Sequence, residues 1–288
     1  MICAQIRREF PDDPIVAEEN PKELLKPERS ESLQQVVDYL REDYPDIDRN
    51  KVIEWIGYGN GHTGQRFWTL DPIGKRRRDN LKKKTILYCV KDGTKGFIRQ
   101  DQYAIALALI VNGEIQVGIL ACPALENEDG LLFYAVRGKG AYEQSIKGFE
   151  TAIPRRIYAV TSDDQKNFRF AESVESAHGD QNKQKVIAQR IGIHTPPIRM
   201  DSQAKYGLVA SGRAALYLRL PNPDRQDYRE NIWDHAAGAI LVEEAGGKVT
   251  DMDGKALDYS THEKMLDNRG VVVSNGTIHE QVLNALKD

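Results

Sequence analysis

YAIALALIVNGEIQVGILACPAL, residues 103–125, is the stretch that decides the fold. Its two apolar runs flank Asn112-Gly113, and Asn-Gly between apolar runs is the strongest short-range signal for a β-hairpin. The stretch therefore predicts two antiparallel strands joined by a tight turn.

The segments on either side extend this sheet. Residues 131–143, LLFYAVRGKGAYE, continue it with a Gly-Lys-Gly turn, residues 67–70 form another strand, and residues 15–17 form a shorter one. We therefore predict that residues 1–150 form an N-terminal α+β lobe built on an antiparallel sheet.

From residue 155 the pattern changes to alternating strands and helices. The expected strands are 157–162, 198–201, 215–220 and 270–274, and the expected helices are 182–191, 205–211, 233–245 and 277–287. Such alternation is typical of α/β structure. Residues 151–288 are therefore predicted to form a C-terminal α/β lobe.

The N-terminal region adds helices and a loop. Residues 2–9 predict the last turns of a helix. Ser32-x-x-Gln35 has the pattern of a capping box and precedes an amphipathic stretch, which predicts a helix there. Residues 45–65 are polar and glycine-rich, which predicts a surface loop.

Composition limits the class of protein. The 288 residues are 40% hydrophobic, enough for a large core or two smaller lobes around a cleft. No apolar stretch approaches the roughly 20 residues that span a bilayer, and no signal peptide is evident. We expect a cytoplasmic protein without membrane contact. Cys3, Cys89 and Cys122 are far apart, which favours buried or idle thiols over a disulfide framework or a zinc site.

Charge is distributed unevenly along the chain. Residues 74–91 contain eight Lys and Arg residues and a single Asp, a net charge of +7. Because the whole chain carries −3, the other 270 residues carry −10. A body that acidic is not built to coat nucleic acid, so we expect no nucleic-acid partner.

Carboxylates stand where four strands or loops end: Glu18, Asp71, Asp92 and Asp234. Each has an ordinary explanation as a solvated turn, a strand terminator before proline, a helix cap or a first-turn acid. Together they suit Mg²⁺, which prefers oxygen ligands shared with a substrate phosphate. The amides of Gly93 and Thr94, at a helix start, would suit phosphate oxygens.

Further motifs carry a resemblance to a known family. If residues 74–91 are removed, FWTLDPI (67–73) runs directly into DGTKGF (92–97). This joined sequence resembles the metal-binding signature of the inositol monophosphatase superfamily, in its 3′(2′),5′-bisphosphate nucleotidase branch. Three more segments agree, and the likeness covers nearly the whole chain outside 74–91: FPDDPIVAEEN (10–20), DSQAKYGLVASGRAALYLRLP (201–221) and IWDHAAGAILVEEAGGKVTD (232–251).

The resemblance implies a fold and a metal site. The fold would be an α+β, layered α-β-α-β-α sandwich of the inositol monophosphatase type. Two or more Mg²⁺ ions would be held in the N-terminal lobe and at its border by Glu18, Asp71, the Ile73 carbonyl, Asp92 and Asp234. Thr94 would polarise the attacking water, and Asp71 and Asp92 would act with it in catalysis.

The resemblance also implies a substrate site in the C-terminal lobe. Beside Gly93 and Thr94, the contacts to an adenosine bisphosphate would fall on His178, Ser202, Lys205 and Arg219. Without the family, these four residues would pass as an exposed loop histidine, a cap, a solvated lysine and a strand charge. With it, the Lys and Arg pair makes chemical sense, because a second, non-reacting phosphate needs cationic partners.

The implied reaction is hydrolysis of adenosine 3′,5′-bisphosphate to AMP and phosphate by in-line attack of water on the 3′-phosphorus. The related sulfated nucleotide would be a second substrate, and the role would lie in sulfur metabolism and salt tolerance. The resemblance also implies inhibition by lithium. We expect a monomer whose partner is this small molecule.

Two departures from the family pattern affect these expectations. The family carries an upstream Asp-x-Ser-Pro-Val-Thr-x-x-Asp segment, one aspartate of which activates water, and Met1 falls downstream of it. We therefore expect weak or absent catalysis from the chain as written. The second departure is the run 74–91, which separates Asp71 from Asp92 and places +7 beside both carboxylates.

The run 74–91 has three interpretations. It is a real loop whose closure costs on the order of 2–3 kcal/mol, a basic arm for nuclear targeting or nucleic acid, or translated intron. Gly74-Lys75 can be encoded GGT-AAG, which contains an intron donor, and removal of the 18 codons rejoins Ile73 to Asp92 in frame. The translated intron explains most.

Two other functions stay open. An inositol phosphate phosphatase would belong to the same superfamily, although DGTKGF and DSQAKY argue against it. A nucleotide-binding protein without catalysis would belong to a different class.

Overall fold

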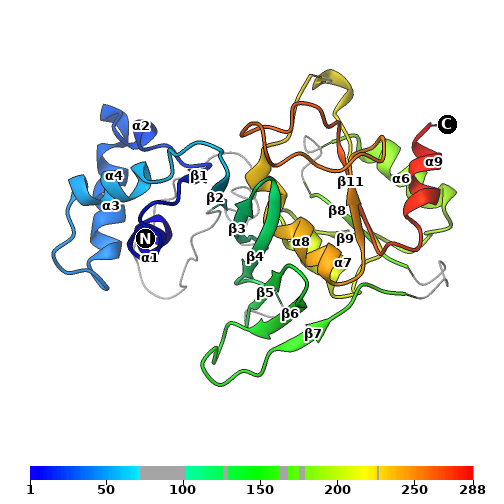
Figure 1. The fold of residues 1–288 in the computed structure, drawn as a ribbon, viewed down its shortest axis with the longest axis horizontal. Coiled ribbons are helices and arrows are strands. Elements are labelled where there is room, and N and C mark those ends of the chain that lie inside the picture. Colours follow the sequence, from blue (N-terminus) through cyan, green and yellow to red (C-terminus); the bar gives the residue numbers. More distant parts are fainter. Residues whose placement is uncertain (72–101, 126–128, 162–167, 175–178, 226, 288) are drawn as a thin grey trace.

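The structure of the chain is a computed structural model, which describes residues 1–71, 102–125, 129–161, 168–174, 179–225 and 227–287. These residues form two β-sheets and several groups of helices, stacked in alternating layers (Figure 1).

The first sheet contains seven strands among the described residues, and they lie side by side in chain order. They are β1 (Ile15–Ala17), β2 (Arg66–Asp71), β3 (Ile105–Val111), β4 (Glu114–Cys122), β5 (Leu131–Val136), β6 (Gly140–Ser145) and β7 (Arg155–Ile157). β1 and β2 run parallel, and each later pair of neighbours is antiparallel. The predicted strands at 15–17, 67–70 and 131–143 are confirmed.

The predicted hairpin is confirmed in its turn as well as its strands. Asn112 and Gly113 have φ angles of 53° and 79°. Both lie in the left-handed region that a type I′ turn requires at its two central residues. Val111 and Glu114 pair directly across the turn, so the turn fixes the register of β3 against β4.

The second sheet has the order β11-β12-β10-β8-β9 among the described residues. Its strands are β8 (Phe170–Glu172), β9 (Ile198–Arg199), β10 (Leu216–Arg219), β11 (Lys248–Thr250) and β12 (Val271–Ser274). β8 pairs in parallel with both β9 and β10, whereas β12 is antiparallel to its two neighbours.

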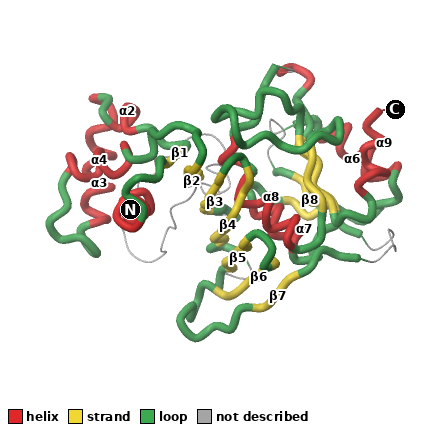
Figure 2. Tube along the Cα trace, in the orientation of Figure 1, coloured by secondary structure: helices red, strands yellow, loops and turns green. Residues whose placement is uncertain are grey.

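Helices lie between and outside the two sheets. α7 (Ala204–Ala210) and α8 (Ala236–Glu244) contact strands of both sheets, and the short helix η5 (Ile232–Asp234) leads into α8. α6 (Gln181–Arg190) and α9 (His279–Lys287) pack together on the outer side of the second sheet. Figure 2 shows the same arrangement: the strands form two groups with α7 and α8 between them.

The remaining helices lie on the other side of the first sheet. α1 (Ile2–Glu9) packs Cys3 and Ile6 against apolar side chains of β1 and β2. α2 (Pro21–Leu24), η1 (Pro27–Arg29), α3 (Ser30–Leu40) and α4 (Arg49–Gly57) continue this layer. The result is the predicted α+β, layered α-β-α-β-α sandwich. A further short helix, η4 (Pro223–Arg225), lies beyond β10.

One apolar core joins the two sheets. It runs from Phe67 and Phe133 of the first sheet through Tyr206 and Ile240 of the middle helices to Val273 of the second sheet, all of them buried. Because these side chains form one continuous cluster, the sheets and the helices between them stabilise one another.

Several sequence predictions beyond residue 155 need correction. The expected strand at 157–162 was wrong: it shares only Ile157 with β7, and residues 158–161 form no strand. β7 pairs with β6 and so ends the first sheet instead of starting the second. β8 and β11 were not expected, because three residues are too few to show a period. The division near residue 150 stays a prediction.

Two N-terminal predictions were wrong in detail. Ser32 lies inside α3, whose N-cap residue Arg29 makes no side-chain capping bond. The predicted surface loop at 45–65 contains α4, which Asp48 caps by accepting a hydrogen bond from the Lys51 amide. The glycines between residues 57 and 64 suggested a loop, but the nine-residue helix α4 ends only at the first of them, Gly57. The predicted helix at 2–9 is confirmed as α1.

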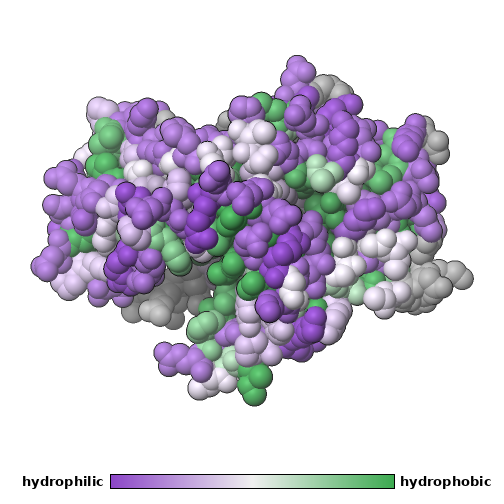
Figure 3. All heavy atoms as spheres, in the orientation of Figure 1, coloured by the Kyte–Doolittle hydropathy of each residue, from purple (hydrophilic) through white to green (hydrophobic). Residues whose placement is uncertain are grey.

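The surface agrees with the composition. Figure 3 shows hydrophilic side chains over most of one face, with hydrophobic ones gathered near β3 to β5. None of the described helices has the length and apolar composition of a membrane-spanning segment. Cys3 and Cys122 are buried free thiols, as predicted, and Cys89 lies outside the described residues.

Candidate functional site

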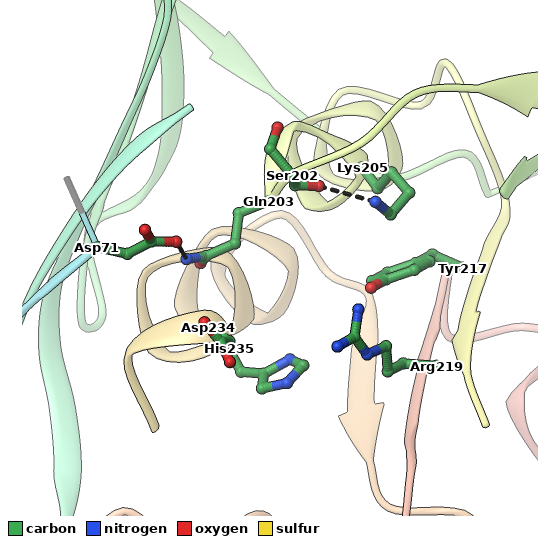
Figure 4. Close-up of a pocket in the computed structure, with 8 residues that line it drawn as sticks. All are labelled: Asp71, Ser202, Gln203, Lys205, Tyr217, Arg219, Asp234 and His235. Atoms are coloured by element: carbon green, nitrogen blue, oxygen red, sulfur yellow. Dashed lines mark hydrogen bonds between the residues drawn. The ribbon is translucent and has the colours of Figure 1, made fainter. Parts of the chain in front are cut away.

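One pocket collects residues from both halves of the fold (Figure 4). Its residues come from the end of β2, the start of α7, β10 and the η5–α8 junction. They are Asp71, Ser202, Gln203, Lys205, Tyr217, Arg219, Asp234 and His235. The pocket therefore unites two acidic residues and two basic ones in one space.

The acidic side of the pocket begins where parallel strands end. β1 and β2 pair in parallel with Ala17 opposite Leu70, so Glu18 and Asp71 follow at the same edge of the sheet. The Glu18 amide donates to the Leu70 carbonyl, which holds the two strand ends together. Asp71 lines the pocket and is 3% exposed, whereas Glu18 lies beside it, outside the lining.

Asp234 approaches from the opposite element. It ends η5, a short helix that packs against β2. The Asn231 side-chain amide donates to Asp234 Oδ2 over 3.0 Å, which fixes the orientation of this carboxylate. Asp71 and Asp234 thereby face one pocket although 163 positions separate them in the sequence.

Gln203 connects the two acidic positions. Its Nε2 donates to Asp71 Oδ2 at 3.2 Å and to the carbonyl oxygen of Trp233, the residue before Asp234, at 2.8 Å. Its Oε1 accepts from the Gly238 amide of α8 at 3.3 Å. One buried side chain thus ties β2, η5 and α8 together beneath the pocket.

Lys205 lies on the basic side of the pocket and is 2% exposed. Its Nζ donates to the carbonyl oxygens of Met200 and Ser202, and lies 5.1 Å from the centre of the Tyr217 ring. Ser202 has a φ of 70°, an uncommon value for a residue with a side chain. The strained turn at Ser202 brings its carbonyl toward the ammonium group, as Figure 4 shows.

Arg219, on β10, lies on the same side of the pocket as Lys205, with the Tyr217 ring between the two (Figure 4). Its Nε donates to Glu230 Oε1 at 3.0 Å, and the Arg219 side chain is 11% exposed. Burial alone would raise the pKa of Glu230, but the positive charge of Arg219 and the hydrogen bond from His235 outweigh it and lower that pKa to about 2. Glu230 therefore carries its negative charge throughout the physiological pH range.

The structure places some of the predicted site residues and leaves others outside its description. Asp71, Asp234, Ser202, Lys205 and Arg219 line one pocket. The predicted residues that lie outside the described part of the chain are Ile73, Asp92, Gly93, Thr94 and His178. The roles assigned to all of them stay predictions.

The sequence reasoning missed three residues that line the pocket. Tyr217 precedes Arg219 by two positions on β10, and the period of two in a strand would have placed both side chains on one face. Gln203 and His235 each stand next to a predicted site residue, but their contacts depend on how α7 and α8 pack, which no local pattern reveals.

The donor set fits a magnesium site. Asp71 and Asp234 supply carboxylate oxygens, the ligands that Mg²⁺ prefers, and Glu18 follows a strand end beside Asp71. Within the described residues, no three acidic, histidine or cysteine side chains stand close enough to hold an ion alone. The other predicted ligands, Ile73 and Asp92, belong to the stretch between β2 and β3 that the description leaves out.

Comparisons with known proteins identify relatives of the chain. A model of the inositol monophosphatase family matches residues 92–288. A 3′(2′),5′-bisphosphate nucleotidase from Oryza sativa is 36% identical over 296 residues, which covers 95% of this chain and 76% of the relative. A protein of the same name from Schizosaccharomyces pombe is also 36% identical, over 99% of this chain and 80% of its own length.

Solved structures show the same fold at lower identity. The IMPase of Thermotoga maritima superposes with a TM-score of 0.60 and 24% identity, over 99% of this chain and 78% of its own. CysQ from Bacteroides thetaiotaomicron, a bacterial member of the inositol monophosphatase family, superposes with a TM-score of 0.55 and 20% identity, over 93% and 78%.

Proposed function

This chain belongs to the inositol monophosphatase family, and we propose that it is a Mg²⁺-dependent 3′(2′),5′-bisphosphate nucleotidase. Its substrate is adenosine 3′,5′-bisphosphate, and its products are AMP and inorganic phosphate. The family resemblance drawn from the sequence motifs is confirmed. The relatives that carry this nucleotidase name support the proposed activity.

The observation that supports the proposal most is the division of the pocket into an acidic and a basic side. Asp71 and Asp234 face it from one side, and Lys205 and Arg219 from the other. A substrate with two phosphates matches this division, because the reacting phosphate can share divalent ions with carboxylates while the second needs cationic partners.

The two sides of the pocket have different proposed roles. Mg²⁺ bound at Asp71 and Asp234, together with the predicted ligands Glu18, Ile73 and Asp92, would neutralise the charge on the reacting 3′-phosphate and stabilise the leaving oxygen. Lys205 and Arg219 bind and orient the 5′-phosphate. Thr94 and the Gly93 amide are assigned to the attacking water and the phosphate oxygens.

Other parts of the proposal concern substrate range and setting. The related sulfated nucleotide has the same two anionic ends and is a second substrate. The family resemblance extends the proposal to a role in sulfur metabolism and salt tolerance. We also propose that the protein is a cytoplasmic monomer and that lithium inhibits it. Size-exclusion chromatography with light scattering tests the monomer.

The experiment is a comparison of phosphate release from three substrates with Mg²⁺: adenosine 3′,5′-bisphosphate, the sulfated nucleotide and inositol 1-phosphate. The same assay decides the expectation of weak or absent catalysis, which stays untested. We propose that the two nucleotides are hydrolysed and that inositol 1-phosphate reacts at least about a hundredfold more slowly. Chelation of Mg²⁺ should abolish release, and sub-millimolar lithium should inhibit it.

Two variants assign the activity to the pocket. Asp71→Asn and Asp234→Asn should each reduce kcat by at least about a hundredfold, because a neutral amide is a poor ligand for Mg²⁺. Asp38→Asn, an exposed residue of α3, is the control and should change nothing. Preferred hydrolysis of inositol 1-phosphate would identify an inositol phosphate phosphatase. Tight binding of the bisphosphate without release of phosphate would identify a nucleotide-binding protein.

A further inference from the structure

A continuous row of hydrogen-bonded side chains runs through the core to Arg219. The Tyr206 hydroxyl lies 2.6 Å from His235 Nδ1, and His235 Nε2 lies 3.3 Å from Glu230 Oε2. The other oxygen of Glu230 accepts from Arg219 Nε at 3.0 Å. Four side chains from α7, the η5–α8 junction, the segment before η5 and β10 thus form a single row.

The direction of each hydrogen bond in this row follows from its chemistry. Burial raises the pKa of Tyr206 well above the usual range for a phenol, so its hydroxyl keeps its proton and donates to His235 Nδ1. A carboxylate only accepts, so His235 Nε2 must carry the proton that points to Glu230. The row therefore donates in one direction toward Glu230, whose second oxygen is left for Arg219.

The start of the row is held rigidly by packing. Tyr206 is fully buried, and its ring lies so close to α8 that a Cβ added at Gly238 would come within 2.3 Å of Tyr206 Cγ. His235 is 2% exposed. Since neither the Tyr206 ring nor the His235 ring has room to turn, the hydrogen bond from His235 holds Glu230 in one position.

The far end of the row sets where the guanidinium group points. Glu230 engages Arg219 through Nε, on the side of the group nearest its own chain. Figure 4 shows the tip of the guanidinium directed into the pocket, between the Tyr217 ring and the His235 ring. A long side chain that would otherwise sample many rotamers is therefore already oriented before a ligand arrives.

We propose that Glu230, with His235 and Tyr206 behind it, is a positioning residue that fixes Arg219 for the 5′-phosphate and so makes the pocket selective for bisphosphates over monophosphates. This inference rests on the function proposed above. None of the three residues touches the reacting 3′-phosphate in this account, so their effect depends on whether the substrate carries a 5′-phosphate.

The test uses two substrates that differ only in that group, adenosine 3′,5′-bisphosphate and adenosine 3′-monophosphate. Glu230→Gln keeps the size of the side chain but removes its charge. It should raise KM for the bisphosphate at least about tenfold with little change in kcat, and alter kcat/KM for the monophosphate by less than about threefold. Arg219→Ala should show the same selective loss.

A double variant tests whether Glu230 acts through Arg219. Glu230→Gln combined with Arg219→Ala should lose no more activity toward the bisphosphate than Arg219→Ala alone. Tyr206→Phe keeps the aromatic ring in the core and removes only the hydroxyl group. It should raise KM for the bisphosphate selectively, by a smaller factor than Glu230→Gln. It also serves as the second test if Glu230→Gln fails to fold.

The control is Glu143→Gln. Glu143 is also buried and bonded to arginines, Arg155 and Arg213, but it lies on β6 outside the pocket. It should leave the ratio of the two kcat/KM values unchanged. An equal loss for both substrates in Glu230→Gln, or full additivity in the double variant, would overturn the positioning role.

Failure of the proposed function has a different signature. If the wild type releases phosphate from neither nucleotide, the catalytic assignment fails, and the positioning role is then judged by calorimetry. Glu230→Gln must weaken the Kd for adenosine 3′,5′-bisphosphate at least about tenfold while Glu143→Gln does not. No binding by the wild type would overturn both.

Discussion

Gln203 shows how one side chain governs the acidic side of the pocket. It donates to Asp71 and to the Trp233 carbonyl beside Asp234, and it accepts from the Gly238 amide. Groups that orient metal ligands are worth about ten- to a hundredfold in metal affinity or activity in known sites. We assign this task to Gln203.

The first prediction concerns this residue. Gln203→Ala should raise the Mg²⁺ concentration for half-maximal activity about tenfold, because Asp71 then loses a donor that holds its carboxylate. A Mg²⁺ titration of phosphate release measures this. Gln144→Ala, at a buried glutamine of β6 whose amide donates to the Phe149 carbonyl, is the matched control. An unchanged Mg²⁺ dependence in Gln203→Ala would contradict the assignment.

At the level of single residues, the sequence motifs predicted the charged side chains that line the pocket. They missed the side chains that hold these charged groups in place by hydrogen bonds. The family motifs contain the charged residues of the pocket, and the structure brings these residues together: Asp71, Asp234, Lys205 and Arg219. Glu230 was not among the predicted site residues. Its link to Arg219 exists only because β10 and the segment before η5 pack side by side.

At the level of helices and strands, α8 packs very closely against the first sheet. A Cβ added at Gly118 of β4 would lie 2.3 Å from Ile240 Cγ2 and 2.7 Å from the Ala237 carbonyl oxygen, both on α8. Neither neighbour can retreat without moving the helix. The absence of a side chain at Gly118 therefore sets the distance between α8 and β4.

The second prediction follows from this contact. Gly118→Ala should lower the free energy of unfolding by about 1–3 kcal/mol, the usual cost of adding a methyl group to a packed core. Urea denaturation followed by tryptophan fluorescence measures the change. Gly64→Ala, at an exposed glycine with no atom within 4 Å of the added Cβ, should stay within about 0.5 kcal/mol of wild type. Equal stabilities of the two variants would show that α8 does not press on β4.

The start of α9 provides a pH-dependent contact. His279 is buried between the hydroxyls of Thr250 and Ser274, which join it to β11 and β12 at 2.9 and 2.8 Å. Burial, with a smaller effect of Lys248, lowers the pKa of His279 from 6.5 to about 4. Between these values the unfolded chain binds a proton at this position that the folded chain does not.

The third prediction is the resulting loss of stability in acid. Since the folded pKa is depressed, the contribution of His279 is complete above pH 6.5 and falls as the pH drops to about 4, by at most about 3 kcal/mol. Denaturation at a series of pH values measures it. His279→Gln should flatten the curve in that window, whereas His194→Gln, at an exposed histidine, should not. A wild-type curve that is flat from pH 6.5 to 4 would contradict this account of His279.

Patterns in the sequence predicted long elements better than short ones. The β3–β4 hairpin, α6 and α9 have enough residues to show a period and clear ends, and all three are confirmed. β8 and β11 have three residues each, and α4 lies in a polar, glycine-rich stretch that predicts a loop. Their placement is decided by pairing with distant strands and packing on other helices, which a local pattern does not contain.

At the scale of the whole molecule, the pocket depends on the two sheets being joined. Asp71 ends a strand of the first sheet, Arg219 ends a strand of the second, and α7 and α8 pack between them in one core. The site is thus a property of the assembled sandwich rather than of either sheet. A ligand that spans the pocket should stabilise the whole fold as a unit.

The fourth prediction tests whether the two sheets unfold together. Adenosine 3′,5′-bisphosphate with Ca²⁺ in place of Mg²⁺, to slow turnover, should raise the Tm in a single transition. AMP, which lacks the 3′-phosphate, should raise it less. Differential scanning calorimetry measures both. Two separate transitions, only one of them moved by the ligand, would show that the sheets unfold independently.

The most direct measurement is the identity of the phosphate that leaves. We propose that the 3′-phosphate binds on the acidic side of the pocket and the 5′-phosphate at Lys205 and Arg219. ³¹P NMR of adenosine 3′,5′-bisphosphate incubated with the protein and Mg²⁺ distinguishes the two monophosphate products. We predict 5′-AMP and inorganic phosphate. Accumulation of adenosine 3′-monophosphate, or an unchanged spectrum, would contradict the account.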